Sequence, residues 1–126
     1  MNIPADLKYS NDHEWICIQD NVVTIGITDF AQGELGDIVY VEIDSLDDEI
    51  EEGEVMGSIE AVKTVSDIFI PVSGRVIAIN EKLENEPELV NSDPYGEGWI
   101  AKIEIPADAK MSHLLDADGY QTLIGV

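Results

Sequence analysis

Short apolar runs separated by polar turns occupy most of the chain, which is the pattern of a mainly β protein. Turn-forming residues recur every eight to twelve residues or so, roughly the spacing of a compact all-β domain. The pattern therefore predicts a small β-sandwich or flattened barrel with helices at its edges. The runs expected to form strands are Trp15 to Ile18, Val22 to Ile27, Ile38 to Ile43, Met56 to Glu60, Ser66 to Ile70, Arg75 to Asn80 and Trp99 to Ile105.

Helical signals are weaker and lie between or after these runs. The segment from Thr28 to Leu35 has a good N-cap in Thr28 or Asp29 and ends before Gly36, so it predicts one short helix. The segment from Glu81 to Asn91 is polar and contains a proline, and it predicts a loop with one helical turn.

The sequence also predicts a helix in the C-terminal region. From Pro106 onward, three apolar residues are spaced for one helix face, and His113 falls within this predicted C-terminal helix. Gly119 is expected to separate the helix from a final turn, Tyr120 to Ile124. The three apolar residues are Met111, Leu114 and Leu115.

Composition then limits the classes of function. A chain of 126 residues with 44% apolar residues predicts one globular domain over residues 1–126. Twenty-seven acidic residues against 6 basic ones give a net charge of -21, which argues against nucleic acid and anionic membranes as partners. The N-terminal residues resemble neither a signal nor a transit peptide, and the single cysteine, Cys17, fits a reducing compartment. A cytoplasmic monomer is expected.

Few residues suggest intrinsic catalysis. His13 and His113 accompany no serine or cysteine nucleophile in a recognisable pattern. The acidic segment from Asp44 to Gly53 does not follow the spacing of a calcium-binding EF-hand, because Leu46 stands at the second ligand position and no glycine at the sixth. We expect neither a metal site nor a catalytic residue.

Lys63 stands out because of its surroundings. Between Tyr9 and Gly74 there are sixteen acidic residues, and Lys63 is the one basic residue. The strands expected on either side predict a hairpin over about 54–71 with Lys63 at its tip. Nearby carboxylates favour the protonated amine, so Lys63 is better suited to modification by another enzyme than to acting as a nucleophile.

The residues around Lys63 closely resemble the lipoyl-attachment segment of the glycine cleavage system H-protein family. The resemblance rests on residues 60–67 and 71–74, and it extends along almost the whole chain. Several separate motifs in the right order are more specific than a lysine hairpin alone. The other matching runs are 9–15, 24–32, 35–42, 87–96 and 98–99.

This resemblance implies a lipoyl/biotinyl-type fold of two half-sheets with short peripheral helices. It implies lipoate as an amide on Lys63 and a carrier that is not itself an enzyme. The family's partners are glycine decarboxylase (P protein), which loads an aminomethyl group, aminomethyltransferase (T protein), which passes the one-carbon unit to tetrahydrofolate, and dihydrolipoyl dehydrogenase (L protein), which restores the disulfide. A lipoate ligase or a lipoyl/octanoyl transferase would attach the cofactor.

The resemblance also assigns candidate site residues. Glu14 and Asp67 match positions that receive the amine of the loaded arm in a surface cleft, although simple surface charge would explain both equally well. Glu60, three residues before Lys63, and Gly74, eleven after it, match positions thought to be read by lipoyl-attaching enzymes.

The sequence departs from the family pattern at two positions. Ala61 stands where many members have serine, and Glu34 stands where some relatives have histidine near the arm. The second difference puts a histidine-assisted release step in doubt.

Three alternatives remain open from the sequence. The chain could be a lipoyl domain of a 2-oxoacid dehydrogenase or a biotinyl domain, although biotinyl domains usually place methionines where Val62 and Thr64 stand. It could be an H-like protein that relays lipoate to other enzymes. It could also be an acidic interaction module in which Lys63 is never modified.

Overall fold

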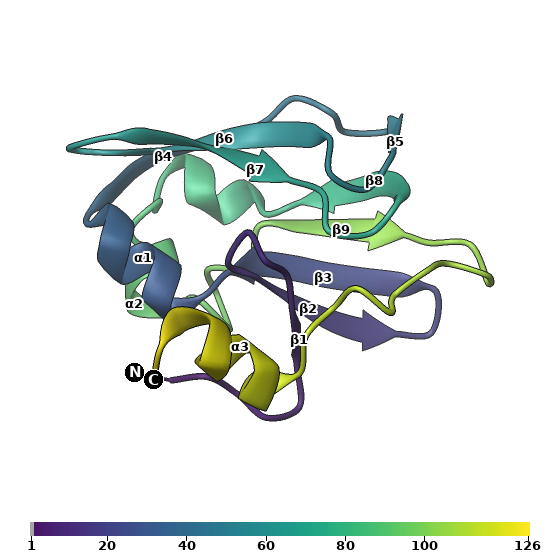
Figure 1. The fold of residues 1–126 in the computed structure, drawn as a ribbon. Coiled ribbons are helices and arrows are strands. Elements are labelled where there is room, and N and C mark those ends of the chain that lie inside the picture. The colour runs from purple at the N-terminus through teal and green to yellow at the C-terminus, as the bar shows by residue number, and fades with distance from the viewer. Residues whose placement is uncertain (1) are drawn as a thin grey trace.

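The computed structural model describes residues 2–126. Its two antiparallel sheets lie one above the other, with α1 and α2 at one end and α3 below (Figure 1). One sheet has the strand order β1-β2-β3-β9-β8-β5 and the other the order β4-β6-β7. The elements are β1 Lys8–Tyr9, β2 Glu14–Gln19, β3 Val22–Ile27, α1 Asp29–Leu35, β4 Ile38–Ile43, β5 Glu49–Ile50, β6 Val55–Ala61, β7 Val65–Phe69, β8 Gly74–Ile79, η1 Glu81–Glu84, α2 Leu89–Ser92, β9 Ala101–Glu104 and α3 Ala117–Ile124.

The mainly β architecture predicted from the apolar runs is confirmed. Alternation along the strands sends one set of side chains into the space between the sheets. There they form the main core, in which Val23, Met56, Ile68 and Val76 are almost fully buried. The expected helix at α1 is confirmed as well: the Thr28 hydroxyl accepts a hydrogen bond from the Ala31 N–H (3.1 Å).

Several boundaries differ from the predictions. The predicted strands ended at Glu60 and began again at Ser66. In the structure β6 continues to Ala61 and β7 starts at Val65, so the turn between them has only three residues, 62–64. The last strand is shorter than predicted, since pairing with β3 and β8 covers only Ala101–Glu104. The segment predicted as a loop with one helical turn contains two short helices, η1 and α2.

The C-terminal helix was predicted in the wrong place. The backbone of Leu115 pairs with Tyr9 beside β1, which holds this segment extended, so the helix begins only at Ala117. Asp116 provides its N-cap by accepting a hydrogen bond from the Gly119 N–H (2.8 Å). Gly119 therefore lies inside α3 and does not end a helix, and His113 lies in the preceding loop.

We expect the glycines at positions 57 and 33 to respond in opposite ways to alanine. A Cβ on Gly57 would collide with the carbonyl oxygen of Glu42 on the neighbouring strand, whereas a Cβ on Gly33 has no neighbour within 4 Å and lies in α1. Gly57→Ala should lower the free energy of unfolding by about 1–3 kcal/mol. Gly33→Ala should raise it by about 0.4–1 kcal/mol. Urea unfolding followed by circular dichroism measures both changes in the free energy of unfolding. If the two variants changed it equally, the predicted collision between a Cβ at position 57 and the Glu42 carbonyl would be contradicted.

Candidate functional site

Lys63 lies at the tip of the β6–β7 hairpin, as predicted. The two strands pair from Val55↔Phe69 to Glu60↔Val65, and the Ala61 N–H closes the turn by donating to the Thr64 carbonyl (2.7 Å). Lys63 is exposed, and its amine has no hydrogen bond or ion pair with residues 2–126. An exposed, unpaired amine on a short rigid turn is available to another protein's active site.

The turn is supported by the connection between α1 and β4. The Val62 N–H donates to the Asp37 carbonyl (3.0 Å). The Lys63 side chain passes over Gly36, where a Cβ would lie 3.4 Å from Lys63 Cε. Gly36 has φ +81°, a conformation that favours glycine, and it caps the C-terminal end of α1. Because it has no side chain, it also leaves room for the Lys63 side chain to pass.

Asn91 on α2 holds this connection in place. Its side-chain amide nitrogen donates to the Gly36 carbonyl (2.9 Å) and to Gln32 Oε1 (3.0 Å), while its oxygen accepts from the Ile38 N–H (2.9 Å). One side chain thus fixes the end of α1 and the start of β4. Sequence reasoning missed Asn91, because nothing in a polar loop signals which side chain will bridge two other elements.

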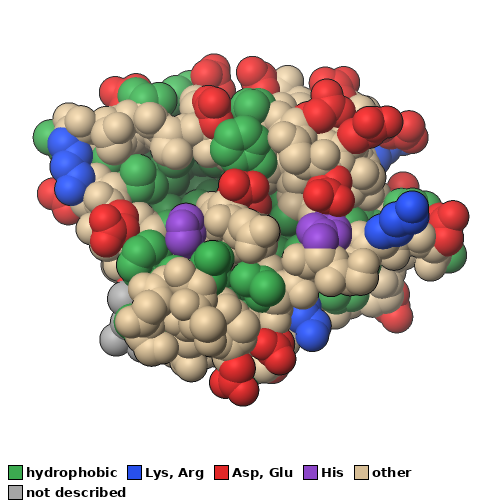
Figure 2. Space-filling model, in the orientation of Figure 1, with side chains coloured by type: hydrophobic (Ala, Val, Ile, Leu, Met, Phe, Trp, Pro, Cys, Tyr) green, Lys and Arg blue, Asp and Glu red, His purple; other side chains and the backbone are tan. Residues whose placement is uncertain are grey.

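A cavity of about 360 Å³ lies beneath the hairpin, between β7 and α1. Hydrophobic side chains line a hollow at this place, with acidic and histidine side chains at its rim (Figure 2). Leu35, next to Gly36, is one of the lining residues, so α1 connects the path of Lys63 to this cavity. The lining consists of Asp12, His13, Glu14, Ile27, Phe30, Ala31, Glu34, Leu35, Ile59, Ser66, Asp67 and Ile68.

The structure brings the two predicted arm-binding carboxylates, Glu14 and Asp67, to the same cavity. Asp67 is exposed on β7. Two further carboxylates, Asp12 and Glu34, share the lining; the resemblance had placed position 34 near the arm, whereas sequence reasoning did not assign Asp12 to the cleft. The cavity therefore combines an apolar interior with four carboxylates, a combination suited to a flexible apolar chain that ends in a cation.

Glu14 is the most unusual of the four because it is only 2% exposed. Its carboxylate accepts hydrogen bonds from the Ser10 hydroxyl (3.1 Å) and the Phe69 N–H (3.1 Å). Burial raises the pKa of Glu14 to about 8, and the nearby charge of Asp12 adds to the rise, while the two hydrogen bonds offset part of it. Burial thus keeps Glu14 largely protonated at neutral pH, whereas an exposed surface carboxylate would be ionised.

The C-terminal helix supports the rim of the cavity. The Tyr120 hydroxyl lies 2.7 Å from Thr28 Oγ1 and 2.9 Å from His13 Nδ1, and its ring stacks on Tyr9 with centroids 4.8 Å apart. His13 has φ +65° and lines the cavity. α3 therefore fixes the N-terminal loop that carries Asp12 and His13.

The two predicted recognition positions lie on different strands, Glu60 on β6 and Gly74 at the start of β8. Glu60 is exposed on β6 next to the turn. Gly74 begins β8, after β7 has run back from the tip, and a Cβ there would lie 2.5 Å from the Glu104 carbonyl oxygen. Close strand packing thus gives a structural reason for glycine at position 74, independent of any recognition by another enzyme.

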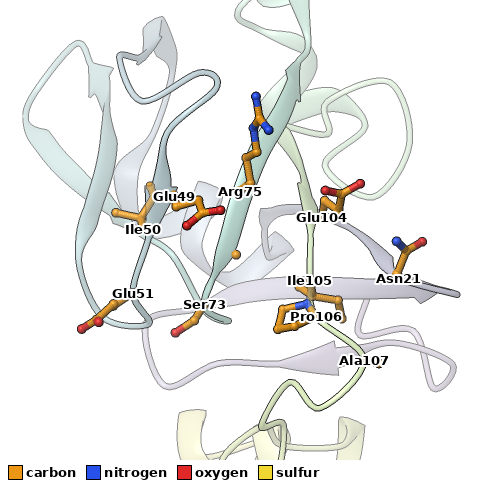
Figure 3. Close-up of a pocket in the computed structure, with 11 residues that line it drawn as sticks. Asn21, Glu49, Ile50, Glu51, Ser73, Arg75, Glu104, Ile105, Pro106 and Ala107 are labelled. Atoms are coloured by element: carbon orange, nitrogen blue, oxygen red, sulfur yellow. The ribbon is translucent and has the colours of Figure 1, made fainter.

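A second cavity, of about 820 Å³, lies at that far end (Figure 3). Arg75 stands between its cross-strand neighbours Glu49 and Glu104. No lysine lines this cavity, so it offers no amine to which a cofactor could be attached, and the cleft near Lys63 is the better functional candidate despite its smaller volume.

Comparison with known proteins agrees with the geometry. Residues 7–125 match the family model described as glycine cleavage H-protein. The chain belongs to this family. It is 53% identical over 125 residues to a glycine cleavage system H protein from Staphylococcus haemolyticus and 52% identical to one from Staphylococcus epidermidis, with 99% of each chain covered. The crystal structure of a glycine cleavage system H protein from Mycobacterium marinum superposes with a TM-score of 0.89 at 36% identity, covering 98% of this chain and 100% of that one.

Membership confirms the predicted family and fold. The chain is a carrier component of the glycine cleavage system and not one of its catalytic subunits. Membership in this family excludes two of the alternatives considered above, a lipoyl domain of a 2-oxoacid dehydrogenase and a biotinyl domain. Among the helices of residues 2–126, none has the length and apolar character needed to cross a membrane.

We predict that Glu14→Gln removes a pH-dependent loss of stability. Between the ordinary pKa of 4.5 and the folded-state value of about 8, the folded chain holds a proton that the unfolded chain releases. The free energy of unfolding therefore falls as pH rises through this window. Glu14→Gln should match the parent near pH 4.5 and exceed it near pH 8.5 by on the order of 4 kcal/mol, because each unit of pKa shift corresponds to about 1.4 kcal/mol.

Thermal and urea unfolding across this pH range measures the difference. Glu84→Gln, an exposed carboxylate on η1, is the matched control and should give a constant offset from the parent. A constant offset for Glu14→Gln as well would contradict the burial argument.

Proposed function

We propose that Lys63 carries lipoate as an amide and that the chain shuttles the aminomethyl group of glycine between the enzymes of glycine cleavage. The observation that carries this proposal is the position of Lys63: an exposed, unpaired amine on a braced turn beside a cleft that combines apolar and acidic groups. A lipoyl group supplies a redox-active disulfide that can accept and release a small carbon fragment. The chain supplies the anchor, the cleft and the charge.

The lining of the cleft fits such an arm. Ile27, Phe30 and Ile68 offer an apolar surface to a hydrocarbon chain. Folding the arm onto this surface would remove both from water and shield the carried group between encounters. Because Lys63 Cε lies beside Gly36 and the cleft begins at the neighbouring Leu35, an attached arm needs only to follow α1 to reach it.

Glu14 and Asp67 would hold the amine that the loaded arm carries. A primary ammonium entering the cleft favours the ionised form of Glu14, so its arrival would displace the proton that burial retains there. Asp67 at the rim would supply a second negative charge. An arm without an amine gains neither interaction, so the cleft would favour the loaded state.

The enzymes that act on this arm would be glycine decarboxylase, aminomethyltransferase and dihydrolipoyl dehydrogenase. Tethering gives the carried group a high effective concentration at each of these active sites in turn. Glu34 lines the cleft where some relatives have histidine, so release of the arm would rely on carboxylates and His13 there.

The proposal predicts a lipoyl-sized mass increment on Lys63 when the chain is incubated with a lipoate-attaching enzyme, lipoate and ATP. Lys63→Arg should gain no mass and should not support glycine cleavage. Lys110→Arg, an exposed control, should behave like the parent. Intact-mass analysis with peptide mapping measures the increment, and normal glycine cleavage by Lys63→Arg would instead favour an unmodified interaction module.

The cleft carries its own prediction. Asp67→Asn and Glu14→Gln should each lower the loaded-to-unloaded ratio about tenfold at fixed glycine and bicarbonate, since a charge-assisted hydrogen bond contributes about 1.5–3 kcal/mol. Mass spectrometry of the lipoylated chain at equilibrium with the decarboxylase measures this ratio. Asp48→Asn in the acidic loop is the control. Equal ratios in all four proteins would place the amine elsewhere.

A further inference from the structure

Large apolar side chains gather around Lys63. Ten large hydrophobic residues are exposed in residues 2–126, and four of them lie on β4 and on the β6–β7 hairpin near its turn. Val62 is 76% exposed and Val65 is 62% exposed, while Val39 and Tyr40 are about half exposed. Isolated apolar residues are normal on a surface, but a cluster at one end of a small sheet marks an interaction site.

Strand register shows that part of this cluster is a continuous row. Tyr40 pairs with Glu60, and Glu60 pairs with Val65. Directly paired residues project from the same face of a sheet, so these three side chains cross all three strands of the β4-β6-β7 sheet on one face. Their neighbour Ile59 is 2% exposed and points to the opposite face, into the core.

Carboxylates border this Tyr40–Glu60–Val65 row. The next row on the same face contains the exposed Glu42 and, on the edge strand β7, Asp67, which also stands at the rim of the cleft. On the other side of Tyr40 the surface is hollowed into a cavity of about 410 Å³, whose lining also includes Glu81 and Glu84. The face therefore presents an exposed apolar side chain on each side of Glu60, with further carboxylates at its edges. It is complementary to a partner with an apolar patch bordered by lysines and arginines.

We propose that the Tyr40–Glu60–Val65 row is the docking surface for the enzyme that attaches lipoate to Lys63. This inference rests on the proposed function of Lys63. An attaching enzyme must bring its active site to Lys63 Nζ itself, so it has to cover the turn and the sheet face next to it. An enzyme that acts on the far end of an attached arm can work without covering this face.

The geometry also explains why an acid at position 60 alone would be a poor recognition signal in so acidic a chain. Glu60 is one of 27 acidic residues, and what distinguishes it is its place between two exposed apolar side chains. Burial of Tyr40 and Val65 against a partner would exclude water around Glu60 and strengthen its pairing with a basic residue.

The test is lipoylation of the unmodified chain by a purified lipoate ligase with lipoate and ATP, followed by intact mass. For the double variant Tyr40→Ser, Val65→Ser we expect KM to rise about tenfold with kcat nearly unchanged, because apolar contacts at the centre of an interface dominate binding. Each single variant should show part of the effect. Ile18→Ser is the matched control, since Ile18 is 40% exposed on β2 in the other sheet, and it should leave KM unchanged.

The outcomes separate this inference from the proposed function. If the parent chain gains no lipoyl mass, the proposed function fails. If the parent is lipoylated and the double variant has the same KM as Ile18→Ser, the docking surface is wrong while the proposed function stands. If the double variant is lipoylated normally but the lipoylated form reacts poorly with glycine decarboxylase, the row belongs to that enzyme and the inference is overturned. Equal melting temperatures of the variants and the control verify that folding is not the cause.

Discussion

The hairpin turn that carries Lys63 rests on the segment between α1 and β4, and a single side-chain amide holds that segment. Asn91 uses its amide oxygen and nitrogen to join α2 to the segment that ends α1 and begins β4. That segment supports the hairpin turn through the bond from Val62 to Asp37. The backbone groups involved would otherwise need water or other partners, so Asn91 helps to support a turn almost thirty residues earlier in the chain.

The site combines two environments that a single surface rarely offers together. Lys63 remains in water, where its amine can enter other active sites, while Glu14 lies 2% exposed within the adjoining cleft. Burying a carboxyl group without a cationic partner is unfavourable, and two hydrogen bonds only partly compensate. A cation that entered the cleft would stabilise the ionised form of Glu14 and so offset the unfavourable free energy of burying it. This is a physical reason to regard the cleft as a binding site.

Extreme acidity acts differently at different places in the molecule. Over most of the surface, the charge of -21 repels anionic partners. Beside the turn, carboxylates surround exposed apolar side chains, an arrangement complementary to a partner surface that is both basic and apolar. At the far cavity, two carboxylates stand directly across from Arg75 on the neighbouring strands, so opposite charges face one another there.

The sequence by itself determined the mainly β class, the N-cap of α1 and the exposed lysine on its hairpin, because alternation, capping and turn chemistry are local. It also placed Glu14 and Asp67 as candidates through resemblance, but only the fold showed that they share one cavity with Asp12 and Glu34. The apolar spacing after Pro106 predicted a helix that the structure does not have there, because the backbone of Leu115 pairs with that of Tyr9 and holds the segment extended. The burial of Glu14 and the contacts of Asn91 arise from elements distant in sequence, and long-range packing alone decides them.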